Sequence, residues 1–399
     1  MLDLRDRQFA VGFNPLSGER DIYNRALHVL SVIKTQAESW GVQLEETLRN
    51  CLLALASANW TMLEIEPLLT HRAFRAQVTD QIEDTRVRSF FERFDKLSPA
   101  QQTTWALAVL NKVNPLISLP TLRRVFGQRQ TLPLRKLLDQ TPGQVTLVSL
   151  AVDRLHEAAH LAGELFVSSF QGAIMARADI PEKSRLPVNL YVDEFETMAS
   201  ERFESIVAEG RRFGLGLTLS HQNNNHLEAN LRHVLRNNVH TQFYFQTGAL
   251  DAGELAREIG GSETREEVRS TLIGQGIGQS FLIRCGQLSV RVQVFPCPDP
   301  AVSREQVQTI KRAAQERHAR PVAEIDRELR EREARYNPRT APPRPNPGVQ
   351  PDTGVAEGAA APPDTPNGEA SSPHPTYEIR HEKLGHFRSH FSEEEEDRS

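Results

Sequence analysis

The sequence predicts an α/β protein in which a parallel sheet flanked by helices follows an all-helical subdomain. Three observations lead to this prediction. Apolar residues recur every three to four positions from residue 22 to 140, which is typical of amphipathic helices. From 141 to 300, short apolar runs alternate with helix-length stretches, as in units of strand, crossover helix and parallel strand. Residues 337–378 carry 11 of the chain's 24 prolines and predict a disordered segment.

The first 140 residues are expected to contain a loop segment and then the helical subdomain. Residues 1–21 have loop character, with a turn at Asn14–Gly18. Residues 22–140 contain few β-branched runs and several amphipathic stretches: YNRALHVLSVIKT, LEETLRNCLLALA, RVRSFFERFDKL and TTWALAVLNKV. We therefore expect this region to be all-helical.

The sheet is expected within residues 141–300. The continuous apolar run GQVTLVSLAV at 143–152 is typical of a strand that is buried on both faces of a parallel sheet. A long amphipathic helix is expected at 157–177, and the strand VNLYV follows it. Two more strands, LGLTLSHQ and VHTQFYFQT, alternate with the helices ERFESIVAEGRRF, LEANLRHVLRN and DAGELAREIG. Residues 279–295 predict an edge hairpin that turns near Cys285-Gly286-Gln287.

The remainder of the chain is expected to be a charged extension and a tail. Residues 301–336 predict a charged helical extension, which Pro321 kinks or splits. Its pairs of opposite charges four residues apart favour a solvated helix over a helix that binds a partner. Residues 337–399, first proline-rich and then acidic (FSEEEEDRS), predict a disordered tail.

Composition excludes several classes of protein. The net charge of −5 provides no overall field that would draw the chain to nucleic acid. Arginine outnumbers lysine by 40 to 7, so phosphate contacts would be made by guanidinium groups. The three cysteines form neither a CxxC pair nor a disulfide framework, which favours a reducing cytoplasm. Neither a signal peptide nor an apolar run of about 18 residues is present in the sequence.

Two adjacent carboxylates follow the strand VNLYV. In open parallel sheets, ligands bind at the carboxyl ends of the strands, and Asp193 and Glu194 are expected there. One carboxylate can orient Mg²⁺ through its water shell, and the other can polarise an attacking water. Gln222 stands at the end of the strand LGLTLSHQ, so it reaches the same edge if the two strands are neighbours. An apolar strand that ends in acidic residues also occurs by chance.

Arg211 precedes that strand and is therefore expected at the opposite edge of the sheet. From there it would reach the site of a neighbouring subunit in a ring more readily than its own. The alternative is a surface charge that complements the dipole of the preceding helix.

A phosphate-binding loop is missing from the 399 residues. The pattern G-x-x-x-x-G-K-[ST] needs a lysine that follows a glycine, and none of the seven lysines does so. The segment GQGIG at 274–278 precedes a strand instead of a helix, so we interpret it as a turn. The histidines at 381, 386 and 390 lie in the predicted tail without a cysteine and are interpreted as tail composition.

Three segments together resemble a known family: LPVNLYVDEFETMAS, EGRRFGLGLTLSHQ and VLRNNVHTQFYFQTGALDAGELAREIGG. They are similar to the Walker B half of HerA/FtsK-type P-loop ATPases, and among these to the TraG/TraD-like coupling proteins of conjugation and type IV secretion. The early VGFNPLSG and the helical subdomain also fit, so the resemblance covers residues 9–300. It implies a partial RecA-like sheet that lacks the Walker A region.

The resemblance also implies a site and its ligands. Asp193 and Glu194 would handle Mg²⁺ and water for ATP hydrolysis, with Asp193 holding the metal through water. Arg211 would act on a neighbouring subunit, Gln222 would sense the nucleotide, and Asn237 matches a recurring family position. The implied assembly is a cytoplasmic homo-oligomeric ring that translocates DNA, with a relaxase-type protein as a further partner. Partners could bring it to the inner face of the membrane.

Because the lysine loop is missing, we expect the chain alone to hydrolyse ATP poorly or not at all. The loop would come from a complementary chain or from a preceding region of this one. Two alternatives remain at this stage. The first is a binding or adaptor module without nucleotide chemistry, which recruits DNA or a relaxase-like partner through its helical subdomain. The second is an unrelated hydrolase that uses Asp193 and Glu194 with another metal.

Overall fold

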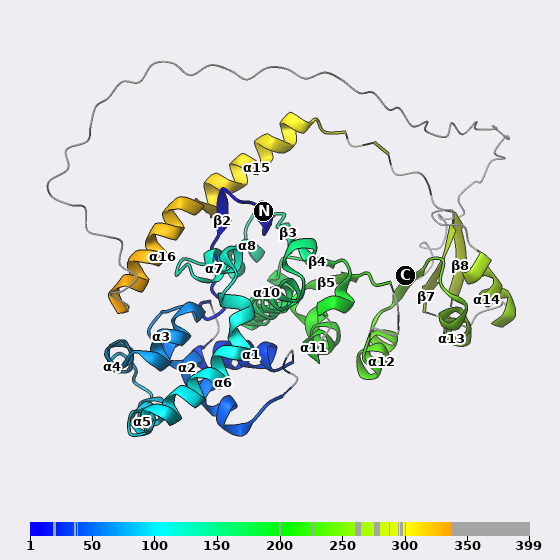
Figure 1. Ribbon diagram of the computed structural model, residues 1–399. Coiled ribbons are helices and arrows are strands. Elements are labelled where there is room, and N and C mark those ends of the chain that lie inside the picture. Colours follow the sequence, from blue (N-terminus) through cyan, green and yellow to red (C-terminus); the bar gives the residue numbers. More distant parts are fainter. Residues whose placement is uncertain are drawn as a thin grey trace, which may run out of the picture. The chain divides into compact units, whose positions relative to one another are not determined.

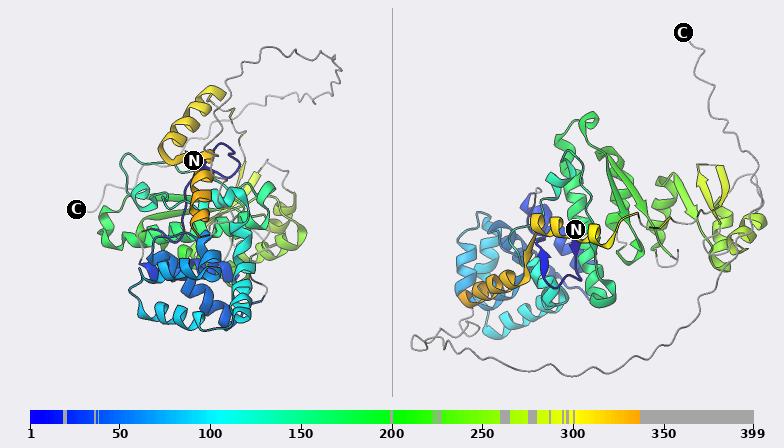
Figure 2. Two further views of the ribbon diagram at one scale, coloured as in Figure 1. Left: turned by 60° about the vertical axis from the view of Figure 1, so that its left-hand side comes forward. Right: turned by 90° about the horizontal axis from the view of Figure 1, so that it is seen from above.

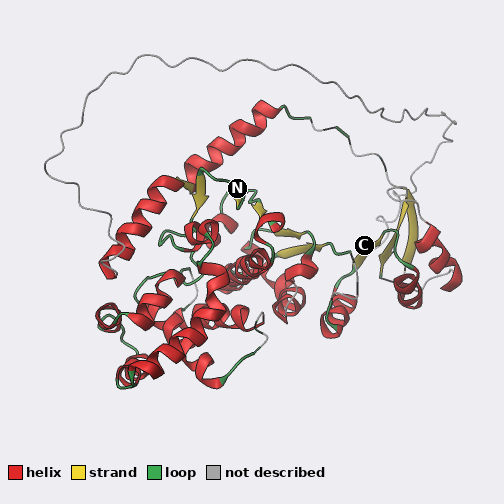
Figure 3. Cartoon of the chain, viewed as in Figure 1, coloured by secondary structure: helices red, strands yellow, loops and turns green. Residues whose placement is uncertain are grey.

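Helices dominate the first third of the chain (Figures 1 and 3). The structure is a computed structural model. It describes residues 1–18, 21–35, 37, 39–198, 201–222, 224, 227–259, 265–274, 280–286, 288–293, 295, 298–299 and 301–336. The predicted tail at 337–399 and most of the GQGIG segment lie outside these residues.

Residues 22–138 fold into a set of short helices. These are α1 (Ile22–Thr35), α2 (Val42–Ser57), the 3₁₀ turn η1 (Met62–Glu64), α3 (Ile65–Thr70), α4 (Arg72–Thr79), α5 (Thr85–Asp95), α6 (Pro99–Ile117), α7 (Pro120–Phe126) and α8 (Leu134–Leu138). Local sequence sets several of their ends. Ser98 and Gln101 form a capping box at the start of α6, where Pro99 occupies the first helical position. Thr61 and Glu64 form another at η1.

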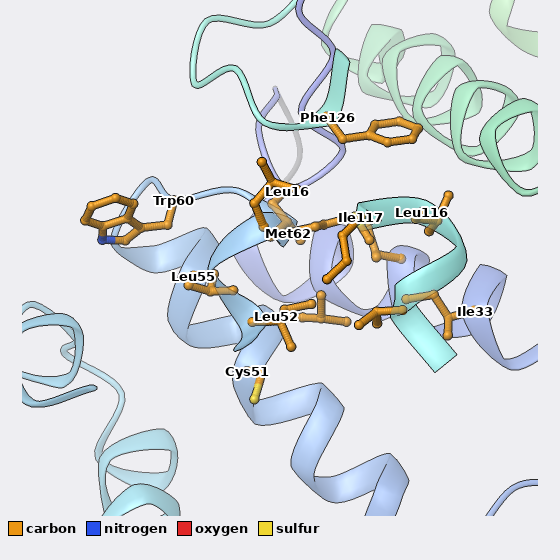
Figure 4. Close-up of a cluster of buried hydrophobic side chains, with 14 of the residues drawn as sticks. Leu16, Ile33, Cys51, Leu52, Leu55, Trp60, Met62, Leu116, Ile117 and Phe126 are labelled. Carbon is orange, nitrogen blue, oxygen red and sulfur yellow. The ribbon is translucent and has the colours of Figure 1, made fainter. Parts of the chain in front are cut away.

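The core of these helices is closed and apolar. Leu48, Cys51, Leu52 and Leu55 of α2 are fully buried and belong to one continuous cluster that includes residues of α1, α3, α5, α6 and α7 (Figure 4). Their spacing of three and four residues places them on one face of α2. We call α1–α8, with η1, the helical block.

Helix α16 (Val322–Tyr336) completes this core, which contradicts the expectation of a solvated extension. Ile325, Leu329 and Arg332 lie on one face of α16 and are buried against the helical block. The ring of Tyr336 packs 5.1 Å from that of Phe74. Side chains at intervals of three and four residues form a stripe, and this stripe was masked in the sequence by the surrounding charges. Helix α15 (Arg304–His318) has no buried residue and does match the expectation.

The sequence predicted that Pro321 would either kink or split the charged helix at 301–336. It splits this helix into α15 and α16. The break is a short strand, β9 (Ala319–Pro321), which pairs antiparallel with β2 (Phe9–Val11). Proline has no N–H to donate, so it is tolerated at such an edge. The amide of Val322 donates to the carbonyl of Gln8 at 2.8 Å, which ties the start of α16 to the N-terminal segment.

The strand expected at 143–152 differs from its prediction. Only β3 (Val148–Ser149) is extended and paired, and it runs parallel to β1 (Leu2–Asp3). Val145 and Leu147 are 85% and 58% exposed, so the segment is not buried on both faces. Burial on both faces needs strands and helices on each side, and the described residues do not provide them here.

The middle of the chain forms a parallel pair of strands covered by helices. After α9 (Val152–Leu155) and the long α10 (Glu157–Met175), two 3₁₀ turns, η2 (Ala176–Asp179) and η3 (Glu182–Ser184), lead to β4 (Val188–Val192). The turn η4 (Phe195–Met198), α11 (Glu201–Glu209) and η5 (Gly210–Phe213) connect it to β5 (Leu215–Leu219). Apolar side chains on one face of both strands pack with Ile174 of α10 and Ile206 of α11.

A second sheet contains β6 (Thr241–Tyr244), β7 (Ser280–Cys285) and β8 (Leu288–Gln293), all antiparallel. The predicted hairpin and its turn are confirmed, with Gly286 in the left-handed region at φ 62°. Helix α12 (Ala229–Asn238) precedes this sheet, and α13 (Ala249–Ile259) and α14 (Arg265–Gly274) pack on it through a small cluster that includes Leu255, Leu272 and Leu282. Helix α14 was not predicted. Figure 2 shows both groups of strands from two further sides. The predicted α/β class is therefore confirmed, but β6 was expected in the parallel sheet and instead pairs antiparallel with β7. Alternation of strands and helices along the chain does not state which strand a given strand will pair with.

Candidate functional site

The pairing of β4 with β5 places Asp193 and Gln222 at one edge of a sheet. The strands are parallel and in register from Val188 opposite Leu215 to Val192 opposite Leu219, so their carboxyl ends coincide. Beyond the strands, the amide of Ser220 donates to the carbonyl of Val192 at 3.0 Å. This is the edge at which open parallel sheets bind ligands.

Asp193 is held by hydrogen bonds to one of its two carboxylate oxygens. The hydroxyl of Ser220 and the amide of Glu194, at 3.1 Å, both donate to Oδ1. Among the described residues, Oδ2 has no hydrogen-bond partner, and the side chain is exposed. The carboxylate is therefore oriented on one side and free to bind on the other.

Glu194 adopts an unusual backbone conformation. Its φ of 49° lies in the left-handed region, which costs about 1–2 kcal/mol for a residue other than glycine. The turn is fixed on its other side, because the amide and hydroxyl of Thr197 both donate to the Glu194 carbonyl at 3.1 and 2.9 Å. Gln222 Nε2 donates to Glu194 Oε1 at 3.0 Å. Strain of this kind is common at functional sites.

A third carboxylate, Glu196, supports Gln222. The backbone amide of Gln222 donates to Glu196 Oε1 at 3.0 Å. The other oxygen of Glu196 is buried and has no hydrogen-bond partner in the part of the chain that the structure describes. None of the ion pairs found among the described residues involves Asp193, Glu194 or Glu196, so this edge of the sheet is a concentrated negative charge without a cation.

Apolar contacts beneath the carboxylates fix the turn. Phe195 is 1% exposed, and its ring lies 5.8 Å from Phe203 and 5.3 Å from His221. Helix α10 passes close behind, since a Cβ at Gly163 would lie 2.2 Å from Sδ of Met198. A side chain at position 163 would therefore force the side chains of Met198 and Leu150 to move.

Arg211 lies at the other edge of the sheet, as predicted. It belongs to η5, which precedes β5, and Gly214 at φ 77° turns the chain into the strand. Five strand residues of about 3.3 Å each separate the edges by about 16 Å. Arg211 is exposed, and none of the described residues pairs with its side chain. The chain does not bring it to its own carboxylates.

Asn237 lies in the last turn of α12. Its Nδ2 is 2.9 Å from Nε2 of His233, one turn earlier on the same helix. No hydrogen bond between described residues joins Asn237 to the carboxylates. Its role therefore stays a prediction from the resemblance.

The donor set fits a magnesium ion that is bound together with a nucleotide. Mg²⁺ usually keeps several waters and uses one or two carboxylates plus substrate phosphates. The exposed Asp193, whose Oδ2 has no hydrogen-bond partner among the described residues, provides such a carboxylate. A preformed cage of three or more His, Cys, Asp or Glu side chains is absent from the described residues. The site is thus suited to a hydrated metal and unsuited to a tightly held structural one.

Two residues of this site were missed in the sequence. Ser220 and Glu196 were present in the segments LTLSHQ and DEFETM but were not singled out. Ser220 lies directly after a strand, which is a signal for a residue at the carboxyl edge. Glu196 had no such signal, because its orientation depends on the left-handed turn at Glu194.

Within the described ranges, no helix is both long and apolar enough to cross a membrane. Two cavities among the described residues lie away from the carboxylates. One is lined by α1, α10 and two loops, and the other includes residues of α15 and the segment at 144–146. The carboxylates instead occupy an open edge.

Comparison with known proteins gives similarity in structure alone. No family model and no curated protein matches the sequence. The structure of the bacterial conjugative coupling protein TrwB is similar, with a TM-score of 0.52 and 12% identity over 74% of each chain. VirB4 of Thermoanaerobacter pseudethanolicus has a TM-score of 0.47 and 12% identity, over 72% of this chain and 74% of that one. The resemblance inferred from the sequence is therefore confirmed at the level of the fold, and the chain has the α/β fold of the coupling-protein type.

Proposed function

We propose that this chain is part of a ring-forming, ATP-driven motor that moves DNA in conjugation or type IV secretion. The observation that carries the proposal is the convergence of Asp193, Glu194 and Gln222 at the carboxyl edge of β4 and β5, in a fold like that of TrwB. Phosphoryl transfer depends on positioning and charge stabilisation, and these three side chains are of the kinds that it uses.

Each residue is assigned one task. Asp193, oriented by Ser220, holds the water shell of Mg²⁺ with its free oxygen. Glu194 polarises the attacking water, and Gln222, bonded to Glu194, senses the terminal phosphate as both donor and acceptor. Bound ATP and Mg²⁺ supply the transferable phosphoryl group and neutralise its charge. Glu196 positions Gln222 through its backbone amide.

Arg211 is assigned to the neighbouring subunit. It lies at the opposite edge of its own sheet, and head-to-tail contacts in a ring bring unlike edges of adjacent subunits together. An arginine supplied in trans stabilises charge in the transition state of phosphoryl transfer. The site thus needs at least two copies of the chain, and its products are released at a subunit interface.

The lysine loop is supplied by a complementary polypeptide segment. Among the described residues β5 is paired on one edge alone, with β4, and β6 on one edge alone, with β7. Tyr191 on the exposed face of β4 is 73% exposed, and Phe243 of β6 is 57% exposed. Open edges and exposed aromatic residues of this kind are usually covered in a working protein. DNA and a relaxase-type protein are proposed as partners of the assembled ring, in the cytoplasm.

The test is hydrolysis of ATP by the chain co-expressed with a segment that contains G-x-x-x-x-G-K-[ST]. We expect Mg²⁺-dependent turnover, and Glu194→Gln is expected to lower kcat by about 100-fold or more, as for loss of a general base. Glu182→Gln, an exposed glutamate in η3, is the control and is expected to leave kcat unchanged.

A mixing experiment tests the subunit exchange. Glu194→Gln and Arg211→Ala are each expected to be inactive alone. In a ring assembled from a 1:1 mixture, about a quarter of the interfaces are expected to be intact, because each needs Glu194 from an Arg211→Ala subunit and Arg211 from a neighbouring Glu194→Gln subunit. No recovery on mixing would contradict the assignment of Arg211. DNA binding that is unaffected by Mg²⁺ and ATP, without hydrolysis, would favour the adaptor function instead.

A further inference from the structure

A cavity of about 310 Å³ lies between the helical block and α10, away from the carboxylates. Four segments line it: the loop at 13–18, helix α1, the loop at 131–135 and helix α10. Its volume is at the lower end of the range for small-molecule sites, and such sites often occur where separate parts of a fold meet.

The lining of this cavity is basic and rich in hydroxyl groups. Arg25, His28 and Arg135 line it, together with the hydroxyls of Ser17, Thr131, Ser168 and Ser169. No aspartate or glutamate is among the described residues that line it. The basic side chains among these described residues favour a ligand with a negative charge.

Arg25 has one N–H group that is left without a hydrogen-bond partner among the described residues. Its Nη1 donates to the carbonyl of Gly18, but Nε is buried and has no hydrogen-bond partner among the described residues. Burial lowers the pKa of Arg25, and the negative charge of Asp21, four residues earlier, opposes this shift. Arg135, by contrast, is engaged by Asp139 and Asp179. A guanidinium with free N–H groups binds carboxylate or phosphate well.

The other walls are apolar and rigid. Phe13 is 2% exposed and stacks on Phe166 with ring centroids 3.9 Å apart. Val29 of α1 and Leu165 of α10 extend this surface. A ligand that fits has a charged group at one end and an apolar body at the other.

We propose that this cavity binds a small organic anion, with a carboxylate or phosphate group at Arg25 and an apolar body along Phe13, Val29 and Leu165. His28 and Ser168 already join α1 to α10 across the cavity, with His28 Nδ1 3.1 Å from Ser168 Oγ. A ligand bound in the cavity would connect α1 and α10 at a second point. Because α10 also contacts the turn at Met198, the anion stabilises the support of the carboxylate edge.

The test uses the full chain without nucleotide, so its result is independent of ATP hydrolysis. The probes are hexanoate, hexyl phosphate and the neutral hexanol, and their binding is measured by calorimetry. At least one anion is expected to bind about tenfold or more tightly than hexanol, and which one does so distinguishes carboxylate from phosphate. Arg25→Gln abolishes this difference. Arg72→Gln, an exposed arginine on α4 outside the cavity, leaves it unchanged.

A second measurement tests the proposal without the Arg25→Gln variant, in case that variant fails to fold. In the unmodified chain, the favoured anion is expected to slow amide hydrogen exchange in α1 around residues 25–29 and in α10 around residues 168–173, where the cavity residues lie. Equal binding of all three probes, or slower exchange confined to other helices, overturns the proposal.

Discussion

The helical block and the sheet-bearing middle of this chain differ in how completely they bury their apolar residues. In the block, Leu48, Leu52 and Leu55 are fully buried within one continuous cluster. Around the strands, the buried clusters are small, and Tyr191 and Phe243 remain 73% and 57% exposed.

The difference in burial follows from how helices and strands satisfy their backbone hydrogen bonds. A helix satisfies its N–H and C=O groups within itself, so a group of helices can close a core wherever their apolar faces meet. A strand needs a neighbour on each edge and a layer on each face. The block closes its own core, whereas β4, β5 and β6 are each paired on one edge alone among the described residues. We propose that another polypeptide segment adds to the sheet there.

The largest effect is expected from the buried ion pair that closes the block. Glu64 is fully buried, and its Oε1 lies 2.9 Å from Nε of Arg332 on α16. Arg332→Met leaves the carboxylate without its partner and is expected to cost about 4 kcal/mol of unfolding free energy. Arg330→Met, on the exposed side of the same helix, is the control and is expected to have little effect.

The loss in Arg332→Met is expected to depend on pH. Burial raises the pKa of Glu64, while the charge of Arg332 lowers it, so removing Arg332 raises this pKa further. A carboxyl group whose folded pKa is raised destabilises the protein as pH rises above its unfolded value of about 4.3. Urea unfolding at pH 4.5 and 7.5 should show the smaller loss at pH 4.5. The same loss at both values would mean that Glu64 is not the cause.

The next largest effect on stability is expected in the helical block, where Leu52 is buried, in contrast to β4, where Tyr191 is exposed. Leu52→Ala opens a cavity in the closed core and is expected to cost about 3 kcal/mol. Tyr191→Ala removes an exposed ring and is expected to change the stability of the chain alone by less than about 0.5 kcal/mol. Denaturant titration of both variants measures the contrast.

The same tyrosine is expected to matter once the sheet is completed. Tyr191→Ala should weaken binding of the complementary lysine-loop segment by about tenfold, measured by titration of the purified segment, because an aromatic ring dominates such contacts. Tyr23→Ala, an exposed tyrosine of α1, is the matched control. Equal binding by Tyr191→Ala and the unmodified chain would refute the open sheet as the docking surface.

The smallest effect concerns backbone strain. Glu194 and Asn59 both have positive φ, 49° and 53°, one at the carboxylate edge and one in the block. Glu194→Gly removes strain of about 1–2 kcal/mol but adds unfolded-state entropy, for a net gain of about 0.5 kcal/mol. Asn59→Gly should give no gain, because asparagine tolerates this conformation. A loss of stability in Glu194→Gly would show that its side-chain bond to Gln222 outweighs the strain.

Much of this protein was determined by its sequence alone. The apolar spacing located helices α1, α2, α5 and α6 of the block, and Pro321 predicted a kink or break where α15 ends and α16 begins. The strands ending at Val192 and Leu219 predicted that Glu194 and Gln222 share an edge, and their side chains are joined by a hydrogen bond. These features are local, or depend on two strands that are close in sequence.

Tertiary structure alone decided the rest. The charged helix α16 was expected in solvent, but Ile325, Leu329 and Arg332 meet the helical block, and no local pattern states which distant surface a stripe will contact. The apolar run at 143–152 was expected to be buried, but burial depends on layers that other segments must provide. Glu196 accepts a hydrogen bond from the amide of Gln222 beyond a turn in which Glu194 is left-handed, and no local pattern in the sequence predicts that conformation. Periodicity specifies which face of an element is apolar, and long-range packing determines what covers that face.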